Sequence, residues 1–192
     1  MQSLLDGIKV IDLSQYIPGP FATRQLAEWG AEVVKIEPPH GDPMRHFMSA
    51  SQGQPSAIYA HLNQGKRVLC LDLKQPDNQS QLRELLKSAD VLLESFRPGV
   101  LARLGFDRDT LMALNPRLVH CALSGFGQEG AYADRAGHDL TYCAVGGLLS
   151  TPSMPTSSMS KVISPVIFPP LADHAGAMQA VSAILAALVA RA

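Results

Sequence analysis

The chain has 192 residues and a mass of 20.6 kDa, with 46% hydrophobic and 17% charged residues. This composition excludes a disordered chain and supplies enough apolar surface for a real core. Sixteen basic residues against 17 acidic ones give a net charge of −1, so no basic excess favours nucleic acid as a partner. The 3 cysteines have neither CxxC spacing nor an even count, which argues against a disulfide framework or zinc site and favours a cytoplasmic location.

No segment has the pattern of a targeting or membrane-spanning sequence. The first ten residues, MQSLLDGIKV, lack the basic and apolar regions of a signal peptide. The most apolar stretch, Ala175–Ala190, contains Gln179 and Ser182 and is shorter than the ~20 residues of a membrane span. The sequence therefore predicts a soluble chain with no membrane partner.

Residues 1–125 alternate between short apolar segments and helical patterns. We expect strands at 8–13, 31–36, 68–73, 91–93 and 118–123, and helices at 20–29, 77–89 and 107–114. The first strand, helix and strand fit within ~30 residues, which implies parallel pairing and a right-handed crossover. The pattern predicts an α/β fold, a Rossmann-like parallel sheet with helices on both faces.

The pattern changes after residue 125. A glycine-rich loop at 124–130 is followed by an expected helix at 138–149, a loop or flap rich in Ser, Pro and Met at 150–166, and a closing helix from Asp173 to Ala192. Asp173 stands where an N-cap would stand. The closing helix is apolar on all sides, so we expect it to be buried. We assign 1–192 to the N-terminal part of one large domain, with a βα core at 1–125 and a second part at 126–192.

Two groups of polar residues follow expected strands. The loop 14–20 lies between the first strand and the first helix, where open parallel sheets bind ligands, although a proline-stiffened turn is the plain alternative. No GxGxxG or GxxxxGK[ST] motif is present, so neither dinucleotide nor P-loop binding is supported. Lys66, Arg67, Arg97 and Arg103 could hold phosphates, or could be solvated surface charges.

His138 and Asp173 form the sharpest candidate pair. A carboxylate at a helix N-terminus is expected to stay charged as a base or nucleophile, and an imidazole exchanges protons near neutral pH. The plain alternatives are that Asp173 is only a helix cap and that His138 is a hydrogen-bonded structural residue. The spacing of the two residues in the sequence, taken alone, favours these alternatives. His174 competes for the same role, while Cys143 is better suited to burial than to attack. No histidine has metal-binding spacing, so no metal site is expected.

Five segments in this order resemble the family III CoA-transferases and the related α-methylacyl-CoA racemases. They are PGPF at 18–21, GKR at 65–67 with LDLK at 71–74, FRPGV at 96–100, NPR to SGFGQ at 115–128, and AGHD to Tyr142 at 136–142 with LAD at 171–173. The resemblance covers nearly the whole chain and implies a CoA-binding large domain in an interlocked homodimer. It implies acyl-CoA and CoA as substrates, with no tightly bound cofactor. The implied CoA contacts are Leu71, Asp72, Leu73, Lys74, Phe96, Arg103, Gly137, Asp139 and Tyr142.

The resemblance also implies two chemistries for the same pair. In the transferases, the aspartate matching Asp173 attacks the acyl-CoA and carries anhydride and CoA-thioester intermediates. In the racemases, the residues matching Asp173 and His138 exchange the α-proton on opposite faces. His138 and Ile17 are closer to the racemases, because the formyl- and oxalyl-type transferases have tyrosine and glutamine there. The sequence therefore favours racemase chemistry, with CoA transfer and an inactive CoA-binding fragment as alternatives.

Two features depart from the family pattern. Pro38 replaces an arginine that binds the CoA nucleotide, so His40 or Arg45 would have to supply that contact. Family members have about twice this length, so the small domain and the glutamate partner of the histidine are expected beyond Ala192. We therefore expect a homodimer or association with a missing C-terminal half.

Overall fold

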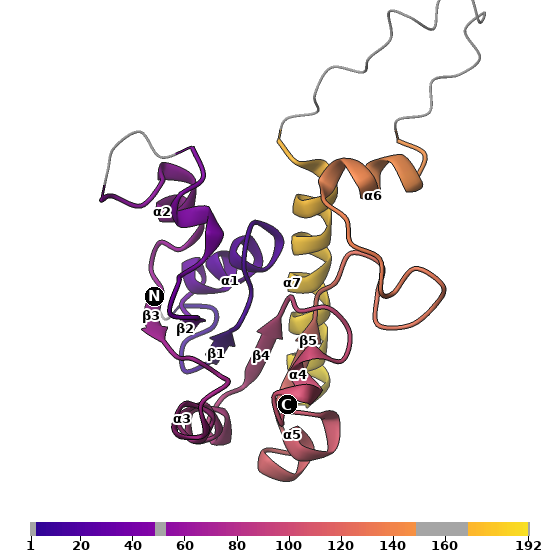
Figure 1. Ribbon diagram of the computed structural model, residues 1–192. Helices are drawn as coiled ribbons and strands as arrows, with labels where there is room; N and C mark the ends of the chain where they lie inside the picture. Colours follow the sequence, from indigo (N-terminus) through magenta and orange to yellow (C-terminus); the bar gives the residue numbers. More distant parts are fainter. Residues whose placement is uncertain (1–2, 49–52, 149–168, 192) are drawn as a thin grey trace, which may run out of the picture.

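A computed structural model describes residues 3–48, 53–148 and 169–191 (Figure 1). Its five strands form one sheet in the order β3-β2-β1-β4-β5, and every neighbouring pair is parallel. The strands are β1 Lys9–Asp12, β2 Glu32–Glu37, β3 Arg67–Cys70, β4 Val91–Glu94 and β5 Val119–Ala122. The predicted α/β fold with a parallel Rossmann-like sheet is confirmed.

Helices cover both faces of this sheet, as expected (Figure 1). They are α1 Pro18–Glu28, η1 Pro43–Arg45 (a 3-10 turn), α2 Ala57–Leu62, α3 Pro76–Lys87, α4 Val100–Arg103, α5 Arg108–Leu114, α6 Asp139–Val145 and α7 Leu171–Arg191. Neighbouring strand residues alternate between the faces. Val10 packs with residues of α1 and α7, whereas Ile11 packs with residues of α3, α4 and α5.

The sheet order creates a crevice at the carboxyl ends of β1 and β4. From β1 the chain continues to β2 and β3 on one side, and from β4 it continues to β5 on the other. The loops that follow β1 and β4 therefore leave the sheet in different directions, which is where open α/β sheets bind their ligands.

The segment LDLK at 71–74 is not the end of a strand, and this prediction was wrong. Strand β3 ends at Cys70, paired with the last residue of β2. The Leu71 N–H still donates to the Glu37 carbonyl oxygen at 2.8 Å, but the next residue of β2 on this side is Pro39, which has no N–H to extend the ladder. Leu71 enters the core with 6% of its surface exposed. Asp72 Oδ1 accepts a 3.1 Å hydrogen bond from the Lys74 N–H, so the segment forms a turn before α3.

Helix α7 begins two residues earlier than expected, so Asp173 lies in its first turn and is not the N-cap. Its buried stripe consists of Ala177, Ala180, Val181 and Ile184, which pack with residues of α1 and the sheet. Met178 and Val189 are 46% and 77% exposed, so the expectation of burial on all sides was wrong.

The expectation that the most apolar stretch is too short for a membrane span was also wrong for α7. The helix has 21 residues and is long and apolar enough to cross a membrane by length and composition, and one stripe of it packs on the rest of the domain. Arg191 fixes its last turn, because Nη2 lies 2.7 Å from Asp90 Oδ1 and Nη1 lies 2.6 Å from the Arg117 carbonyl oxygen. The expected flap at 150–166 lies outside the described residues.

Candidate functional site

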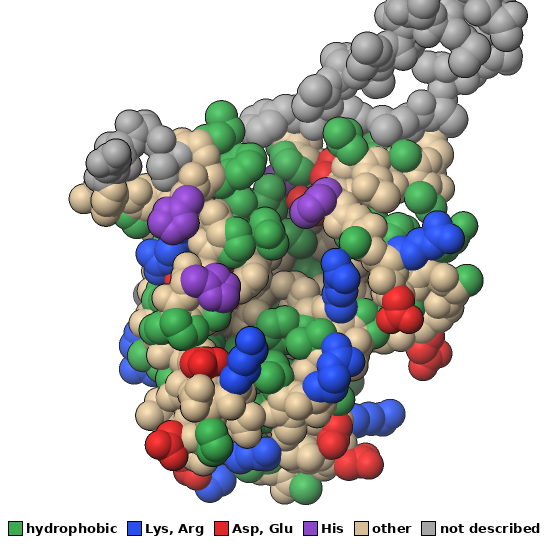
Figure 2. All heavy atoms as spheres, viewed as in Figure 1, with side chains coloured by type: hydrophobic (Ala, Val, Ile, Leu, Met, Phe, Trp, Pro, Cys, Tyr) green, Lys and Arg blue, Asp and Glu red, His purple; other side chains and the backbone are tan. Residues whose placement is uncertain are grey.

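A pocket of about 670 Å³ lies at the carboxyl ends of the strands. Its walls come from the loops after β1, β4 and β5 and from the first turns of α6 and α7. Figure 2 shows this face of the molecule hollowed, with histidine and basic side chains near the hollow. The polar residues in the lining are Gln15, Tyr16, Ser95, Arg97, Ser124, Arg135, His138, Tyr142 and Asp173.

A buried ion pair supports the loop between β1 and α1. Lys66 Nζ lies 3.2 Å from Asp12 Oδ2, and both side chains are fully buried. The hydroxyls of Ser14 and Thr23 also donate to the Asp12 carboxylate. Burial by itself would raise the pKa of Asp12, but Lys66, Lys35 and these hydroxyls lower it to about 2. Asp12 is therefore a permanent anion beneath the loop.

Lys66 has no free capacity for a phosphate. Its ammonium donates to Asp12, to the Pro20 carbonyl oxygen at 2.8 Å and to Asn63 Oδ1 at 3.0 Å. Burial lowers its pKa to about 8, partly offset by Asp12. The hypothesis of a phosphate contact at Lys66 is therefore wrong, because the side chain is an internal structural group.

A second buried pair joins the same loop to the segment after β2. Lys35 Nζ donates to Asp42 Oδ2 at 2.9 Å and to the Ser14 carbonyl oxygen at 2.8 Å, and the side chains of Lys35 and Asp42 are fully buried. Asp42 Oδ1 accepts from the Tyr16 N–H at 3.3 Å. Both ends of the turn at residues 14–16 are thus fixed by buried charge.

Asp173 lines the pocket from the first turn of α7 and is half-buried. Its N–H donates a 3.0 Å hydrogen bond to Asp139 Oδ1. Burial and the nearby Asp139 carboxylate raise the pKa of Asp173, and His174 and His138 offset part of this effect. Burial and a second carboxylate therefore oppose the effect of the helix N-terminus, which favours the charged form of this group.

His138 lines the same pocket from the N-cap position of α6. Its ring lies edge-on to that of Tyr16, with 6.1 Å between centroids and 70° between planes. The competing candidate His174 is outside the lining, with its ring against Phe21 and Nδ1 2.6 Å from the Pro170 carbonyl oxygen. The structure thus brings His138, and not His174, to the pocket with Asp173.

Tyr142 forms part of the pocket wall. Its hydroxyl donates a 2.7 Å hydrogen bond to the Gly137 carbonyl oxygen. The ring lies so close to Gly125 and Gly137 that a Cβ at either position would overlap it. Burial, followed by Asp173, raises the pKa of Tyr142. Tyr142 therefore presents a neutral phenol to the pocket, and close contact with the backbone at Gly125 and Gly137 holds its ring in place.

The predicted CoA contacts divide into two groups. Phe96, Gly137 and Tyr142 line the pocket, and Asp139 lies behind it, bonded to Asp173. Five others are outside the lining: Leu71, Asp72, Leu73, Lys74 and Arg103. Sequence reasoning missed Tyr16 and Arg135. Tyr16 lies in a loop that the motif had indicated, whereas nothing in the sequence distinguished Arg135, which stacks on Tyr132 at 4.4 Å.

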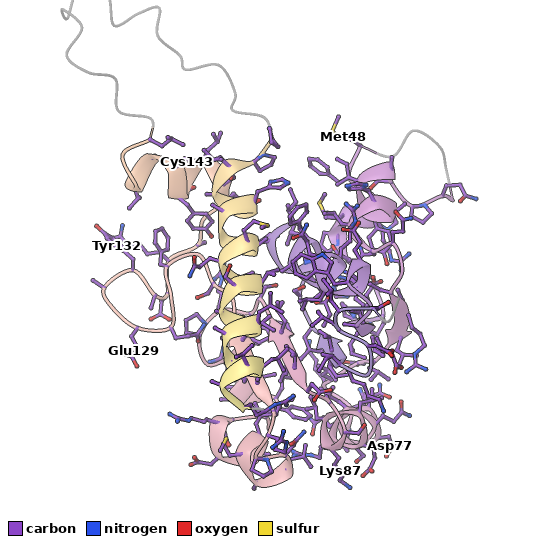
Figure 3. The ribbon with its side chains drawn as sticks, turned by 180° about the vertical axis from the view of Figure 1, so that it is seen from behind. Met48, Asp77, Lys87, Glu129, Tyr132 and Cys143 are labelled. Atoms are coloured by element: carbon purple, nitrogen blue, oxygen red, sulfur yellow. The ribbon has the colours of Figure 1, made fainter. Side chains whose placement is uncertain are left out.

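The cysteines near the site are not suited to nucleophilic attack. Cys143 is buried in α6, with Sγ 3.7 Å from Asp139 Oδ2, and Figure 3 shows it near the start of α7. Burial, together with Glu94, raises the pKa of Cys121 to about 11. Across residues 3–48, 53–148 and 169–191, no group of three or more His, Cys, Asp or Glu could hold a metal ion.

Together, the sheet order and the pocket contents define a class of protein. It is an α/β protein whose switch-point pocket holds a carboxyl group and an imidazole, a combination suited to nucleophilic or acid–base chemistry. The chain belongs to CoA-transferase family III, whose sequence profile matches residues 5–192.

Curated relatives and a solved structure agree with this assignment. The chain is 40% identical over 192 residues to succinate–glutarate CoA-transferase of Agrobacterium fabrum, which covers 96% of this chain and 47% of that protein. It is 44% identical over 146 residues to human α-methylacyl-CoA racemase, with 76% of this chain and 35% of that protein covered. A crystal structure of a CaiB/BaiF family protein from Brucella suis matches with a TM-score of 0.88 and 35% identity, over 100% of this chain and 50% of that one. The chain thus spans about half the length of such relatives.

Proposed function

We propose that this chain takes part in CoA transfer from an acyl-CoA donor to a free carboxylate acceptor, with Asp173 as the nucleophile. A carboxylate oxygen of Asp173 attacks the thioester carbonyl, the C–S bond breaks, and CoA leaves as the thiolate. The thiolate then attacks the Asp173 carbonyl of the resulting anhydride, which releases the donor acid and leaves a thioester between Asp173 and CoA. The acceptor carboxylate reverses these two steps, which forms the new acyl-CoA and regenerates Asp173.

The observation that carries this proposal is the position of Asp173, half-buried in the first turn of α7 and lining the pocket at the switch point. Sequence motifs alone favoured proton exchange. The relative from Agrobacterium fabrum, matched over 96% of this chain, is named as a CoA-transferase, and this supports transfer. In this proposal, His174 and then His138 favour the ionised, nucleophilic form of Asp173.

Proton exchange at the α-carbon of a 2-methylacyl-CoA is the second candidate. It is favoured by the presence of two proton carriers, Asp173 and His138, in one pocket, and by the similarity to a racemase. A carboxyl group with a raised pKa exchanges a proton near neutral pH more readily than an ordinary one.

The proposal includes contacts to both ends of CoA. We propose that Phe96, Gly137 and Tyr142 contact the pantetheine end of CoA in the pocket. The turn after β3, which includes Asp72, Leu73 and Lys74, and Arg103 on α4 would contact the nucleotide end. We also propose a cytoplasmic protein that pairs with a second copy or with a C-terminal half.

The experiment compares three activities of the wild-type protein and Asp173→Asn. Succinyl-CoA with glutarate tests transfer, a 2-methylacyl-CoA in deuterated water tests α-proton exchange, and calorimetry tests CoA binding. We expect transfer by the wild type and a loss of roughly 1,000-fold or more in Asp173→Asn, with CoA binding retained. Deuterium exchange without transfer would instead support the second candidate, and CoA binding without either reaction would make the chain a binding module.

A further inference from the structure

We propose that Tyr16 is a positioning residue for the pocket, and that its ring fixes the orientation of the His138 imidazole beside Asp173. Tyr16 and His138 come from loops 122 residues apart in sequence, and both line the pocket. Their rings meet edge-on at 6.1 Å and 70°, an arrangement that aromatic pairs prefer. The activity part of this inference rests on the proposed function, whereas the contact itself does not.

The backbone of Tyr16 is held in a conformation that tyrosine rarely adopts. Its φ is +64°, in the left-handed region, where a Cβ comes too close to the following carbonyl oxygen. Such strain persists only where the surroundings fix it, and it is concentrated at functional sites. Glycine or asparagine would adopt this backbone conformation with less strain. The backbone therefore does not explain why a tyrosine stands at this position, and we look for the reason in its ring.

The buried ion pair of Lys35 and Asp42 holds the Tyr16 backbone in this conformation. The Tyr16 N–H donates to Asp42, and Asp42 is held by Lys35, whose ammonium also binds the Ser14 carbonyl oxygen. Lys35 and Asp42 are fully buried, so water does not weaken their attraction as it does at a surface. The two residues therefore fix the turn on both sides of Gln15 and direct the Tyr16 ring toward α6.

This arrangement restrains a side chain that would otherwise be free to rotate. His138 is exposed at the N-cap of α6, and Tyr16 is 46% exposed. Contact with a ring on a fixed turn limits the rotamers of the imidazole, so the ring stays in the pocket that Asp173 also lines. In a transfer or proton-exchange reaction, a misplaced group costs turnover more than it costs substrate binding.

The test compares Tyr16→Phe, Tyr16→Asn and Tyr16→Gly in the otherwise unchanged protein. The ¹H–¹³C resonance of the His138 imidazole, assigned by its loss in His138→Gln, reports the ring contact directly. We expect this resonance to keep its wild-type position in Tyr16→Phe and to move in both Tyr16→Asn and Tyr16→Gly. Asparagine and glycine tolerate the left-handed backbone, so neither variant should melt at a lower temperature. An unchanged resonance in these two variants would overturn the inference, whether or not the protein is active.

The kinetic measurement separates positioning from a general structural role. For CoA transfer, we expect Tyr16→Asn and Tyr16→Gly to lower kcat about tenfold with little change in KM, and Tyr16→Phe to retain the wild-type kcat. A kcat retained in Tyr16→Gly would contradict the positioning role even if the resonance moved. Failure of the wild-type protein to transfer CoA would contradict the proposed function alone, because the resonance test of the contact would still stand.

Discussion

The N–H of Asp173 donates a 3.0 Å hydrogen bond to Oδ1 of Asp139, which joins the first turns of α7 and α6 at the edge of the pocket. The bond brings a second carboxylate close to the proposed nucleophile. Burial and this carboxylate together hold the pKa of Asp173 above its ordinary value. Asp139 therefore both positions Asp173 and opposes its ionisation.

Asp139→Asn should move the acidic limb of the pH–rate profile for CoA transfer to lower pH. Asparagine can still accept the bond from the Asp173 N–H, but it removes a negative charge, so Asp173 ionises at lower pH. The measurement is kcat/KM for transfer against pH. Asp134→Asn, at an exposed position in the loop before α6, is the matched control and should leave the profile in place. A shift to higher pH in Asp139→Asn would contradict this electrostatic account.

Removing Asp12 should destabilise the fold more than removing the whole ion pair. Asp12→Asn leaves the buried Lys66 ammonium without its carboxylate, which costs about 3–5 kcal/mol, whereas Asp12→Asn combined with Lys66→Met removes both charges. Urea unfolding at neutral pH of the two single variants and the double variant measures the difference. A double variant less stable than Asp12→Asn would show that the pair itself stabilises the loop.

The same carboxylate predicts how stability depends on pH. The folded-state pKa of Asp12, about 2, is below its ordinary value of 3.8. Its contribution is therefore fully present above pH 4 and is lost as pH falls from about 4 to about 2. The expected loss is about 2 kcal/mol, and the slope of stability against pH should be smaller in this window in Asp12→Asn. Equal slopes for the two proteins would indicate that Asp12 does not titrate as described.

Two glycines in helices should respond in opposite ways to alanine. At Gly19, in the first turn of α1, a Cβ would overlap the Ser14 side chain, so Gly19→Ala should cost roughly 1–3 kcal/mol or more. At Gly176, in α7, the nearest atom to a Cβ is Leu123 Cδ1 at 3.9 Å, so Gly176→Ala should stabilise by roughly 0.5–1 kcal/mol. Thermal unfolding of both variants provides the check. Stabilisation by Gly19→Ala would contradict the close packing of the turn at Ser14.

Arg191→Met should loosen the end of α7 without affecting its first turns. The variant loses the bonds to Asp90 and to the Arg117 carbonyl oxygen, while the stripe that packs with α1 is unchanged. Hydrogen exchange measured by mass spectrometry should be faster in the last turns of the helix and unchanged around Asp173. Uniformly faster exchange over the whole helix would mean that Arg191 holds α7 to the sheet as a unit.

The architecture was predictable because it depends on local patterns. The apolar segments around Val10, Val33 and Val91 became buried parallel strands, and the helices between them followed from periodicity and from prolines at helix starts. Errors arose at the ends of elements. Leu71 and Leu73 continue the apolar pattern of β3, but the neighbouring strand ends at Glu37, so the ladder stops. Pro169 and Pro170 were a usable signal that α7 begins at Leu171, before Asp173.

The site was predictable only in part, because its electrostatics come from residues far apart in the chain. Asp173 and His138 could be selected by motif, and both reached the pocket. The raised pKa of Asp173 depends on burial and on Asp139, which is 34 residues away in sequence. The position of Asp173 at a helix N-terminus gives no information about either of these. The ion pair of Asp12 with Lys66 spans 54 residues, so sequence alone left Lys66 as a possible phosphate ligand.

The central claim, that the Asp173 carboxylate is the nucleophile, is tested most directly by isotope transfer. The protein is incubated with succinyl-CoA and glutarate labelled with ¹⁸O in its carboxylates, and the peptide containing Asp173 is analysed by mass spectrometry. An oxygen of the labelled glutarate becomes the bridging oxygen of the anhydride with Asp173. When CoA attacks the glutaryl carbon, this oxygen stays on the Asp173 carboxylate, so turnover should label the side chain. No label should appear when succinyl-CoA is left out. Product formation with no ¹⁸O at position 173 would contradict the account.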